Sequence, residues 1–336
     1  MSNLRRIGFL AAFLLAIVAL GALLWLSWGV WTPAGRDRKI MVLIPNGSST
    51  KKIAHLLAKS GVIRSPSGFI LLALWQHKSE SLKPGAYELS PAMTPSKILK
   101  KIVAGDVSAK WVTFPEGFTT SQIAERLHAE GLANMDRFYS LARTRGSAFT
   151  TSFPHPGDDL EGYLFPDTYL ISIGSSEESI IQEMLDNFGK RIADLMPEIA
   201  ASGMNLHEIV ILASLIEREA RISKDRPLIS AVLRNRLSKG MHLECDATIL
   251  YALGRHKSRL FYRDLGIDSP YNTYRYPGLP PGPIANPGLA SIKAALHPAN
   301  VDYLYYVAKR DGSHIFSRTL EEHNRAKQIA RGGTGR

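Results

Sequence analysis

The most constraining feature of this sequence is a run of 25 residues near its N-terminus that carries no charge. It extends from Ile7 to Trp31 and reads IGFLAAFLLAIVALGALLWLSWGVW. About 20 apolar residues in a helix span the hydrocarbon core of a bilayer, because a helix bonds all of its backbone polar groups internally. A cleaved signal peptide has a shorter apolar region of about 7–15 residues. The run therefore predicts a retained transmembrane helix, with Trp25, Trp28 and Trp31 at one membrane interface.

The charges that flank this run do not decide its orientation by themselves. Arg5 and Arg6 precede it, and Arg36, Arg38 and Lys39 follow it, so the positive-inside rule is nearly balanced. We expect a short cytoplasmic leader and export of the rest of the chain.

The composition narrows the class of partner. The formal net charge is +11, which suits a polyanion, an anionic membrane surface or an acidic polymer. We find no zinc-finger spacing, basic zipper or RNA-binding aromatic signature, and so expect no nucleic acid partner. A single cysteine, Cys245, excludes an intrachain disulfide and a cysteine-based metal cluster. A membrane surface or an envelope polymer is the more natural partner.

A pattern that begins after the apolar run occurs twice, 70 residues apart. IMVLIPNGSSTKKIAHLLAKSGVI (Ile40–Ile63) aligns with KWVTFPEGFTTSQIAERLHAEGLA (Lys110–Ala133). Each copy reads as a short strand, a Pro-x-Gly turn, a Ser/Thr-rich helix start and a Gly stop. Chance agreement within a generic strand-turn-helix pattern is the alternative explanation. The repeat predicts a pair of small α/β modules.

The segment NLHEIVILASLIEREARI predicts a helix from Asn205 to about Ile222 that is apolar yet contains Glu217 and Glu219. Residues two apart differ by about 200° around a helix, so the two carboxylates cannot both face one cleft. Glu217 shares its face with small residues, which would let a bulky substrate approach. An apolar surrounding raises the pKa of a carboxyl toward neutrality, as a general acid requires.

These considerations make Glu217 a candidate catalytic acid and Glu219 a structural residue paired with an arginine. The alternative is that Glu217 forms an (i, i+4) ion pair with Arg221 on a solvated face. Spacing alone leaves these two interpretations evenly balanced.

Candidate substrate-binding residues follow this helix. The segment YNTY supplies flat apolar rings beside hydrogen-bonding groups, a mixture that suits sugars, although such a loop can equally be a structural brace. Asp246 is either a substrate contact or the cap of the helix that carries Tyr251. Asn235 lies in a polar stripe of a further helix, where a solvated position is the alternative. The candidates are Tyr271, Asn272, Thr273, Tyr274, Asn235 and Asp246.

Taken together, several blocks of this sequence resemble the endolytic murein transglycosylase family (MltG/YceG-like proteins). The blocks are ASLIERE, AVLRNRLSKGMHLECDATILYALG, YNTYRYPGLPPGPIANPG, IKAALHPA and YLYYVA. With the N-terminal run and the repeated modules, the resemblance covers nearly the whole chain. One departure is visible, because the family has Thr-Asp-Pro-Thr where this chain has Cys245-Asp246-Ala247-Thr248.

The resemblance implies a membrane-anchored enzyme at the extracytoplasmic face of the cell (inner) membrane that cuts glycan strands of nascent peptidoglycan internally. In such a lytic transglycosylase one acid suffices, because the 6-hydroxyl of the muramic acid attacks C1 and leaves a 1,6-anhydro end. The family motif maps its catalytic glutamate onto Glu217. No metal and no cofactor are expected, and the expected partners are glycan strands, the membrane, and peptidoglycan synthases or division proteins.

The predicted fold class is α+β, with a transmembrane helix, repeated LysM-like α/β modules and a mixed α/β catalytic domain. The predicted segments are a leader at 1–6, the membrane anchor at 7–31, a linker at 32–39, a LysM-like module at 40–109, a second module with connecting helices at 110–204 and the catalytic domain at 205–336. Two other functions remain open. One is a non-catalytic glycan-binding scaffold, and the other is a two-carboxylate glycosidase with Glu161 or Asp167 as the partner of Glu217.

Overall fold

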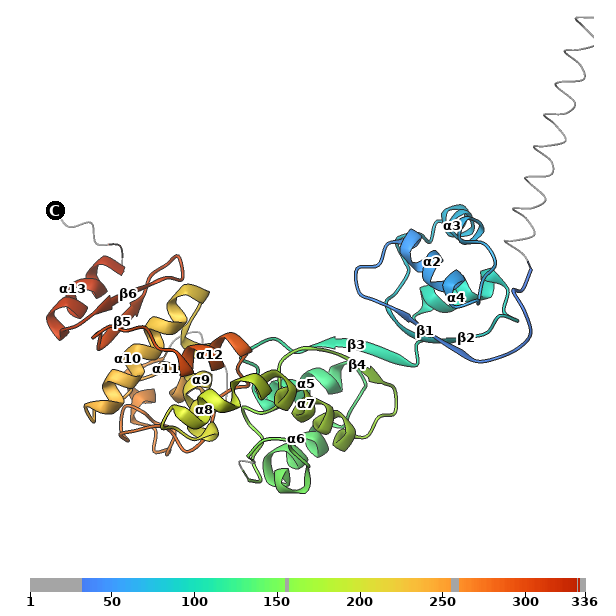
Figure 1. Ribbon diagram of the computed structural model, residues 1–336. Helices are drawn as coiled ribbons and strands as arrows, with labels where there is room; N and C mark the ends of the chain where they lie inside the picture. The colour runs from blue at the N-terminus through green and yellow to red at the C-terminus, as the bar shows by residue number, and fades with distance from the viewer. Residues whose placement is uncertain (1–31, 155–156, 255–259, 331, 333–336) are drawn as a thin grey trace, which may run out of the picture. The chain divides into compact units, whose positions relative to one another are not determined.

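The computed structural model describes residues 32–154, 157–254, 260–330 and 332 of the chain (Figure 1). The predicted leader at 1–6 and the predicted anchor at 7–31 lie outside these residues. Within them, no single helix is both long and apolar enough to cross a membrane. Two consecutive helical segments, Glu177–Ala201 and Leu206–Glu219, are together long and apolar enough to cross a membrane, by length and composition only. They are bent by 112° relative to each other.

The chain divides into two compact units. The first comprises residues up to Val112 together with Tyr169–Ile173, and the second comprises Thr113–Thr168 and the chain from Gly174 onward. The predicted boundary between a second module and the catalytic domain, near residue 204, therefore falls inside the second unit.

A four-stranded sheet of order β1-β2-β3-β4 organises the first unit. Strands β1 and β2 are antiparallel, with Ile40 opposite Leu89, and β2 is antiparallel to β3. The elements are β1 (Ile40–Ile44), α2 (Thr50–Lys59), α3 (Pro66–Trp75), β2 (Gly85–Leu89), α4 (Pro95–Ala104), β3 (Ala109–Thr113) and β4 (Thr168–Ser172).

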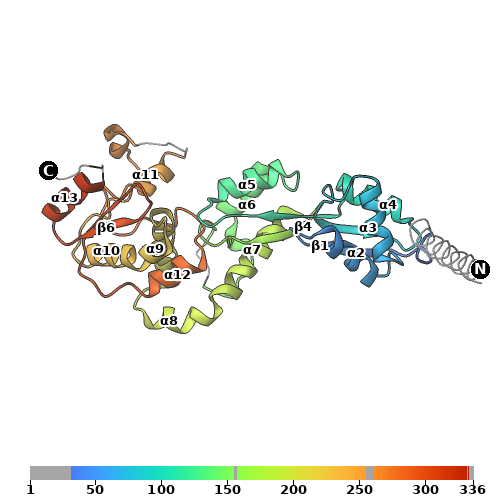
Figure 2. The same ribbon diagram turned by 90° about the horizontal axis from the view of Figure 1, so that it is seen from above.

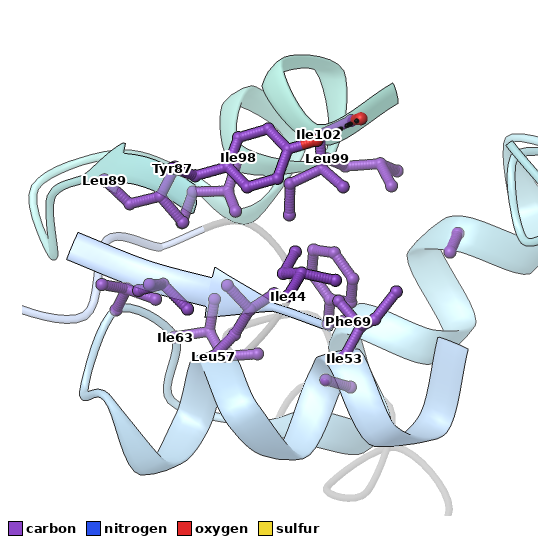
Figure 3. Packing of buried hydrophobic residues seen from close by; sticks show 14 of the residues in the cluster. Ile44, Ile53, Leu57, Ile63, Phe69, Tyr87, Leu89, Ile98, Leu99 and Ile102 are labelled. Atoms are coloured by element: carbon purple, nitrogen blue, oxygen red, sulfur yellow. Dashed lines mark hydrogen bonds between the residues drawn. The ribbon is translucent and has the colours of Figure 1, made fainter. Parts of the chain in front are cut away.

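The core of the first unit lies between its sheet and its helices. Figure 3 shows Ile44 of β1 with Leu57 of α2 and Phe69 of α3 facing Tyr87 of β2 and Ile98 of α4. Phe69 and Ile98 are fully buried. The buried Tyr87 hydroxyl donates to the carbonyl oxygen of Lys83 at 2.7 Å, so its burial leaves no polar atom without a partner.

The predicted repeat is confirmed as a pattern of secondary structure. α2 begins after the N-cap Ser49, and α5 (Thr120–Ala129) begins after the N-cap Thr119, exactly 70 residues later. The turns that precede them place Gly47 (φ 69°) and Gly117 (φ 80°) in the left-handed region, where a side chain would be strained. The same turn chemistry therefore produces the same local structure in both copies.

Helices dominate the second unit. They are α5, α6 (Met135–Thr144), α7 (Glu177–Ile192), α8 (Met196–Ala201), α9 (Leu206–Glu219), α10 (Arg226–Ser238), α11 (Asp246–Ala252), α12 (Leu289–Leu296) and α13 (Leu320–Ala330), with short 3₁₀ turns at Gly146–Ala148, Ala193–Leu195, Ser223–Asp225 and Tyr262–Gly266.

The central helix of this unit is α9. α10, α11 and α12 all contact it (Figure 2). Its N-terminus carries a reciprocal capping box, in which Asn205 and Glu208 each bond the other's backbone N–H. The helix ends at Glu219 rather than near Ile222, because Ala220 adopts an extended conformation (φ −77°, ψ 117°).

An antiparallel hairpin, β5 (Tyr305–Ala308) and β6 (His314–Ser317), precedes α13. The turn between the two strands contains Asp311 and Gly312. The chain is a mixed α/β protein with antiparallel sheets, which agrees with the predicted α+β class.

Candidate active site

The two glutamates of α9 have different surroundings. Glu217 accepts hydrogen bonds from Arg226 Nη2 at 3.2 Å and from the backbone N–H of Gly288 at 3.0 Å. Its side chain is 6% exposed and that of Arg226 is 13% exposed. The partner is Arg226 rather than the Arg221 considered from the spacing.

A second carboxyl lies beside this pair. Glu116 Oε2 is 3.8 Å from Arg226 Nη2, so one guanidinium faces two carboxyls. Burial raises the pKa of Glu116, the negative charge of Glu217 adds to this rise, and Arg226 opposes it. The backbone at Gly288 comes so close that a Cβ there would lie 1.8 Å from Glu116 Oε1. Glu217 and Arg226 thus tie the start of α12 to α9.

The small-residue face beside Glu217 is not open. Val210, Ala213 and Ser214 are completely buried. Ser214 Oγ accepts a hydrogen bond from the backbone N–H of Ile284 at 3.1 Å, which shows what covers this face. The prediction that small neighbours admit a bulky substrate here is therefore wrong, because small side chains also let another segment pack closely.

Among the residues that the structure describes, no arginine forms an ion pair of the predicted kind with Glu219. Its Oε1 accepts a hydrogen bond from the backbone N–H of Ala247 at 3.5 Å. Burial and the negative charge of Asp246 together raise the pKa of Glu219 to about 7, against the opposing effects of Ala247, Tyr306 and Arg218. The residue still keeps part of its surface accessible. A carboxyl with these properties is poised to exchange a proton near neutral pH.

Asp246 and Tyr274 join Glu219 in one place. The Tyr274 hydroxyl donates to Asp246 Oδ1 at 2.6 Å. Burial raises the pKa of Tyr274, with further contributions from Asp246 and Glu219, which keeps the phenol protonated. Asp246 is the first residue of α11, and the cap position belongs to Cys245, so the alternative that Asp246 is merely the cap is wrong.

Asn272 and Thr273 hold their own loop together. Asn272 is fully buried and donates to the carbonyl oxygens of Leu265 and Ile267. Thr273 Oγ1 accepts from the backbone N–H of Cys245 at 3.0 Å and lies 2.9 Å from Thr248 Oγ1. Both side chains are at most 2% exposed, so the structure gives them bracing roles and offers no support for substrate contact.

The remaining two candidates, Asn235 and Tyr271, contact other parts of the second unit. Asn235 Nδ2 donates to the carbonyl oxygens of Val301 and Tyr303, both at 2.9 Å, which fixes the segment before β5. The ring of Tyr271 lies 4.9 Å from that of Tyr251. Neither residue shares a described bond with Glu219 or Asp246, and their roles in binding stay predictions.

Glu161, considered above as a second catalytic carboxyl, is buried at the centre of a bonding network. It accepts from the backbone N–H of Thr120 at 2.9 Å, from Asn286 Nδ2 at 3.1 Å and from Arg143 Nη1 at 3.1 Å. The hydroxyl of Tyr251 is 3.3 Å away. Burial raises the pKa of Glu161 to about 7, against the opposing effects of Arg143 and Thr120.

Asp167, the other carboxyl considered, has a different character. It accepts hydrogen bonds from Asn187, from Arg191 at 2.5 Å and from the backbone N–H of Thr168. These bonds lower the pKa of Asp167 although partial burial acts to raise it. Such a carboxyl is suited to holding charge rather than to donating a proton.

A cavity of about 370 Å³ is lined by residues that include Glu161, Arg218 and Ala247. One part of the cavity is lined by Arg218, which precedes Glu219 in the chain, and by Ala247, whose backbone N–H bonds the Glu219 carboxyl. Glu161 and Tyr251 line another part, with Tyr139 of α6 nearby. The cavity therefore combines aromatic rings with hydrogen-bonding and charged groups, a lining typical of sugar and small-ligand sites.

Sequence reasoning missed three residues of this arrangement. They are Arg226, which pairs with Glu217; Tyr306, which acts on the pKa of Glu219; and Asn286. Asn286 is fully buried and accepts at Oδ1 from the backbone N–H groups of Gly162 and Leu164. The asparagine within a Pro/Gly-rich segment was the available signal for it. Within the described residues, no three His, Cys, Asp or Glu side chains are grouped so as to hold a metal ion.

The fold and the site define an α/β enzyme with a carboxyl group poised for acid–base chemistry beside a sugar-sized cavity. The model of the YceG-like family matches residues 42–329, and the chain belongs to this family. The resemblance predicted from the sequence is thereby confirmed.

Known relatives agree with this assignment. A Bacillus subtilis (strain 168) protein named endolytic murein transglycosylase is 38% identical over 88% of this chain and 86% of its own length. A Streptococcus pneumoniae (serotype 2) protein of the same name is 32% identical over 87% of this chain, which spans 58% of that protein. A crystal structure of a yceG-like protein from Listeria monocytogenes is 41% identical, with a TM-score of 0.62, and the match covers 85% of this chain and 98% of that one.

Proposed function

We propose that this protein is a lytic transglycosylase that cleaves the MurNAc–GlcNAc β-1,4 bond within nascent peptidoglycan strands and leaves 1,6-anhydro-MurNAc ends. The names of the curated relatives support the substrate class. The observation that carries the chemistry is the Glu219 carboxyl, whose pKa is raised to about 7 by burial and by the adjacent Asp246.

Glu219 takes the role of proton donor in this proposal, in place of the Glu217 predicted from the sequence. Glycosidic cleavage needs a protonated carboxylic acid beside the leaving oxygen. Glu217 has both of its carboxyl oxygens engaged, Oε1 with Arg226 Nη2 and Oε2 with the backbone N–H of Gly288. The candidate sugar contacts Asp246 and Tyr274 gather around Glu219 instead. Glu217 stays a testable alternative.

The reaction balances with one acid. Glu219 donates its proton to the oxygen that links C1 of MurNAc to the next GlcNAc, and the C1–O bond breaks. The 6-hydroxyl oxygen of the same MurNAc forms a bond to C1, and its proton passes to the Glu219 carboxylate. No water is consumed, and the acid is regenerated. The carboxylate of Asp246 stabilises the positive charge that develops at C1, as expected for an oxocarbenium-like transition state.

The cavity beside Glu219 is the proposed place for a sugar ring. Its volume of about 370 Å³ suits a small ligand. Tyr139 and Tyr251 offer ring faces to the CH-rich side of a sugar, and Arg143 and Gln122 offer hydrogen-bond donors to its rim.

The proposal also covers the membrane anchor, the role of the first unit and the biological effect of cleavage. The uncharged run at 7–31 anchors the protein in the cell membrane, with the two units on the extracytoplasmic side. The first unit acts as a LysM-like module for glycan, and cleavage limits glycan length in concert with peptidoglycan synthases or division proteins. The net charge of +11 supports an acidic polymer as substrate.

Product analysis tests the proposal. Full-length protein in detergent is incubated with purified peptidoglycan, and the fragments are analysed by mass spectrometry. Anhydro-muramyl ends at internal cleavage positions are the expected result. Reducing ends would instead indicate a two-carboxylate glycosidase, and absence of any product would indicate a glycan-binding scaffold.

Two isosteric variants of neighbouring residues identify the acid. Glu219→Gln is expected to lower turnover about 10²- to 10⁴-fold, the usual contribution of a general acid. Glu217→Gln is the matched control, because it changes the same chemical group two residues away on the same helix. The assignment fails if Glu217→Gln abolishes turnover and Glu219→Gln leaves it intact in folded protein.

A further inference from the structure

Helix α3 is apolar along its whole length and yet lies at the surface of the first unit. Its sequence, PSGFILLALW (Pro66–Trp75), contains no charged residue. With 10 residues it is too short to cross a bilayer. An apolar helix of this length is usually either a core helix or a helix that lies in a membrane interface. The exposure of its side chains distinguishes between these two cases.

Only one face of α3 belongs to the core. Phe69 and Leu72 are at most 1% exposed, and Figure 3 shows Phe69 within the cluster of buried side chains. Leu71, Leu74 and Trp75 are 50%, 55% and 66% exposed. Their spacing of three and four residues places them side by side on one face of the helix. α3 therefore has a second apolar face that the described residues leave at the surface, as is typical of an interaction site.

The segment before β1 brings the start of α3 next to the end of the uncharged run. Arg64 Nε donates to the carbonyl oxygen of Pro33 at 3.0 Å. Arg64 directly precedes Ser65, the N-cap of α3. Pro33 lies two residues after Trp31, where the run ends. A helix of 10 residues is about 15 Å long, so the whole of α3 lies close to the point where the chain leaves the proposed anchor.

The excess of basic residues lies in the same part of the chain. Residues 32–112 contain 13 lysines and arginines but only four aspartates and glutamates. Residues 113–336 contain 26 of each kind and are neutral. Arg64 and Lys78 flank α3 on its two sides in the sequence. Positive charge near an anionic lipid surface is attracted to it, and this attraction adds to that of an exposed apolar face.

We propose that the exposed face of α3, formed by Leu71, Leu74 and Trp75, docks on the anionic lipid surface in which the protein is anchored. The three side chains enter the boundary between headgroups and acyl chains, where an indole is favoured. Lys78, three residues after Trp75, meets the lipid phosphates. The inference rests on the proposed membrane anchor, which brings this face to the bilayer. It gives the first unit a lipid contact besides its proposed role toward glycan.

A fluorophore on α3 tests this contact. Leu74→Cys of the full-length protein is labelled with the environment-sensitive dye nitrobenzoxadiazole and reconstituted into vesicles of phosphatidylcholine and phosphatidylglycerol. Leu74 is exposed, so the substitution leaves the core intact. The native Cys245 is buried, and unchanged protein carried through the same labelling is the blank. We expect a blue-shifted emission that is quenched by lipids with a nitroxide near the headgroup.

Met41→Cys is the matched control. Met41 is also apolar, and it is 57% exposed. Val42 and Ile44 of β1 point into the core that α3 covers, so Met41 points to the other side of the sheet, because side chains alternate along a strand. Quenching is expected at position 74 and not at position 41.

The lipid charge is tested in the same vesicles. Replacing phosphatidylglycerol by phosphatidylcholine, or raising the salt concentration, should weaken the quenching at position 74, because both changes reduce the attraction between the basic unit and the surface. Quenching that is insensitive to both changes would overturn the recognition of anionic lipid.

Other results would exclude this occupant of the face. If soluble chito-oligosaccharide rather than lipid changes the emission at position 74, the face belongs to a glycan site and the proposal is overturned. Equal quenching at positions 74 and 41, or none at either, in protein that floats with the vesicles also overturns it. Protein that does not float with the vesicles overturns both the anchor and the docking surface. If position 74 is quenched but mass spectrometry finds no cleavage of peptidoglycan, the proposed activity fails and the lipid contact stands.

Discussion

At the scale of single residues, the site depends on how three buried or half-buried carboxyls are partnered. Glu217 is paired with Arg226, whereas Glu219 lies beside the like charge of Asp246. Glu161 is paired with Arg143 yet has a pKa raised to about 7, because its burial outweighs the attraction of the guanidinium. All three residues are glutamates, so the sequence alone does not distinguish their chemistry. The groups that surround each carboxyl in the fold make the three chemically different.

The raised pKa of Glu161 predicts a pH-dependent stability. An unfolded glutamate has a pKa of about 4.3, so between about pH 4.3 and pH 7 the folded state binds more protons at this site. The stabilising contribution is complete below the unfolded pKa and is lost as the pH rises through about 7. Thermal unfolding of Glu161→Gln, whose amide does not ionise, should therefore depend less on pH between 5 and 8 than that of the unchanged protein.

Glu80→Gln is a suitable control for this experiment, because Glu80 is exposed in the first unit. Its melting temperature should follow the pH dependence of the unchanged protein. Equal slopes for Glu161→Gln and the unchanged protein would contradict the assigned direction of the shift.

At the scale of elements, α9 is the structural axis of the site. Its capping box fixes where the helix begins, and the extended Ala220 fixes where it ends, one residue after Glu219. α11 then brings Asp246 and Ala247 to that end, and β5 brings Tyr306. Three elements distant in sequence therefore meet at the last residue of one helix.

The capping box predicts a measurable contribution of Asn205 to stability. Asn205 Oδ1 accepts from the backbone N–H of Glu208 at 2.9 Å, and Glu208 Oε2 accepts from the backbone N–H of Asn205 at 2.8 Å. Asn205→Ala removes the first bond and should lower the free energy of unfolding by about 1 kcal/mol. Urea unfolding followed by a probe in the second unit measures this loss.

Ser49→Ala provides the comparison in the first unit. Ser49 caps α2 by accepting from the backbone N–H of Lys52 at 3.3 Å. Its effect should appear in the unfolding of the first unit, with the second unit unchanged. If Asn205→Ala has the same free energy of unfolding as the unchanged protein, the prediction is wrong. Water would then replace the bond to the Glu208 N–H without loss of stability.

At the scale of the whole molecule, the chain has two hydrophobic cores. Phe69, Leu72 and Tyr87 belong to the core of the first unit. The aromatic cluster of the second unit contains Tyr163 and Phe188, whose ring centroids are 5.2 Å apart. Each unit therefore has the buried apolar area that a domain needs for its own stability.

Two large-to-small substitutions test the independence of these cores. Phe69→Ala and Phe188→Ala each remove a fully buried ring and should cost about 3–5 kcal/mol in the unit concerned. Hydrogen exchange measured by mass spectrometry should show faster exchange in the first unit for Phe69→Ala and in the second unit for Phe188→Ala. Faster exchange in both units for either variant would show that the two cores unfold as one.

The sequence predicted those features that depend on local chemistry. The repeat and the start of α9 at Asn205 follow from caps, turns and periodicity, which act over a few residues. The family resemblance followed from the order of short blocks. The helical geometry also established that Glu217 and Glu219 point in different directions.

Only the tertiary structure shows which groups surround Glu217 and which surround Glu219. The small face of α9 was interpreted as open, but Ile284 and its neighbours cover it, because a chain segment and a substrate are equally able to use a small-residue surface. Arg226 pairs with Glu217, Asp246 and Tyr306 act on the pKa of Glu219, and all three come from other elements. The pKa of a carboxyl is set by groups within a few ångströms in space, whereas the sequence records neighbours along the chain.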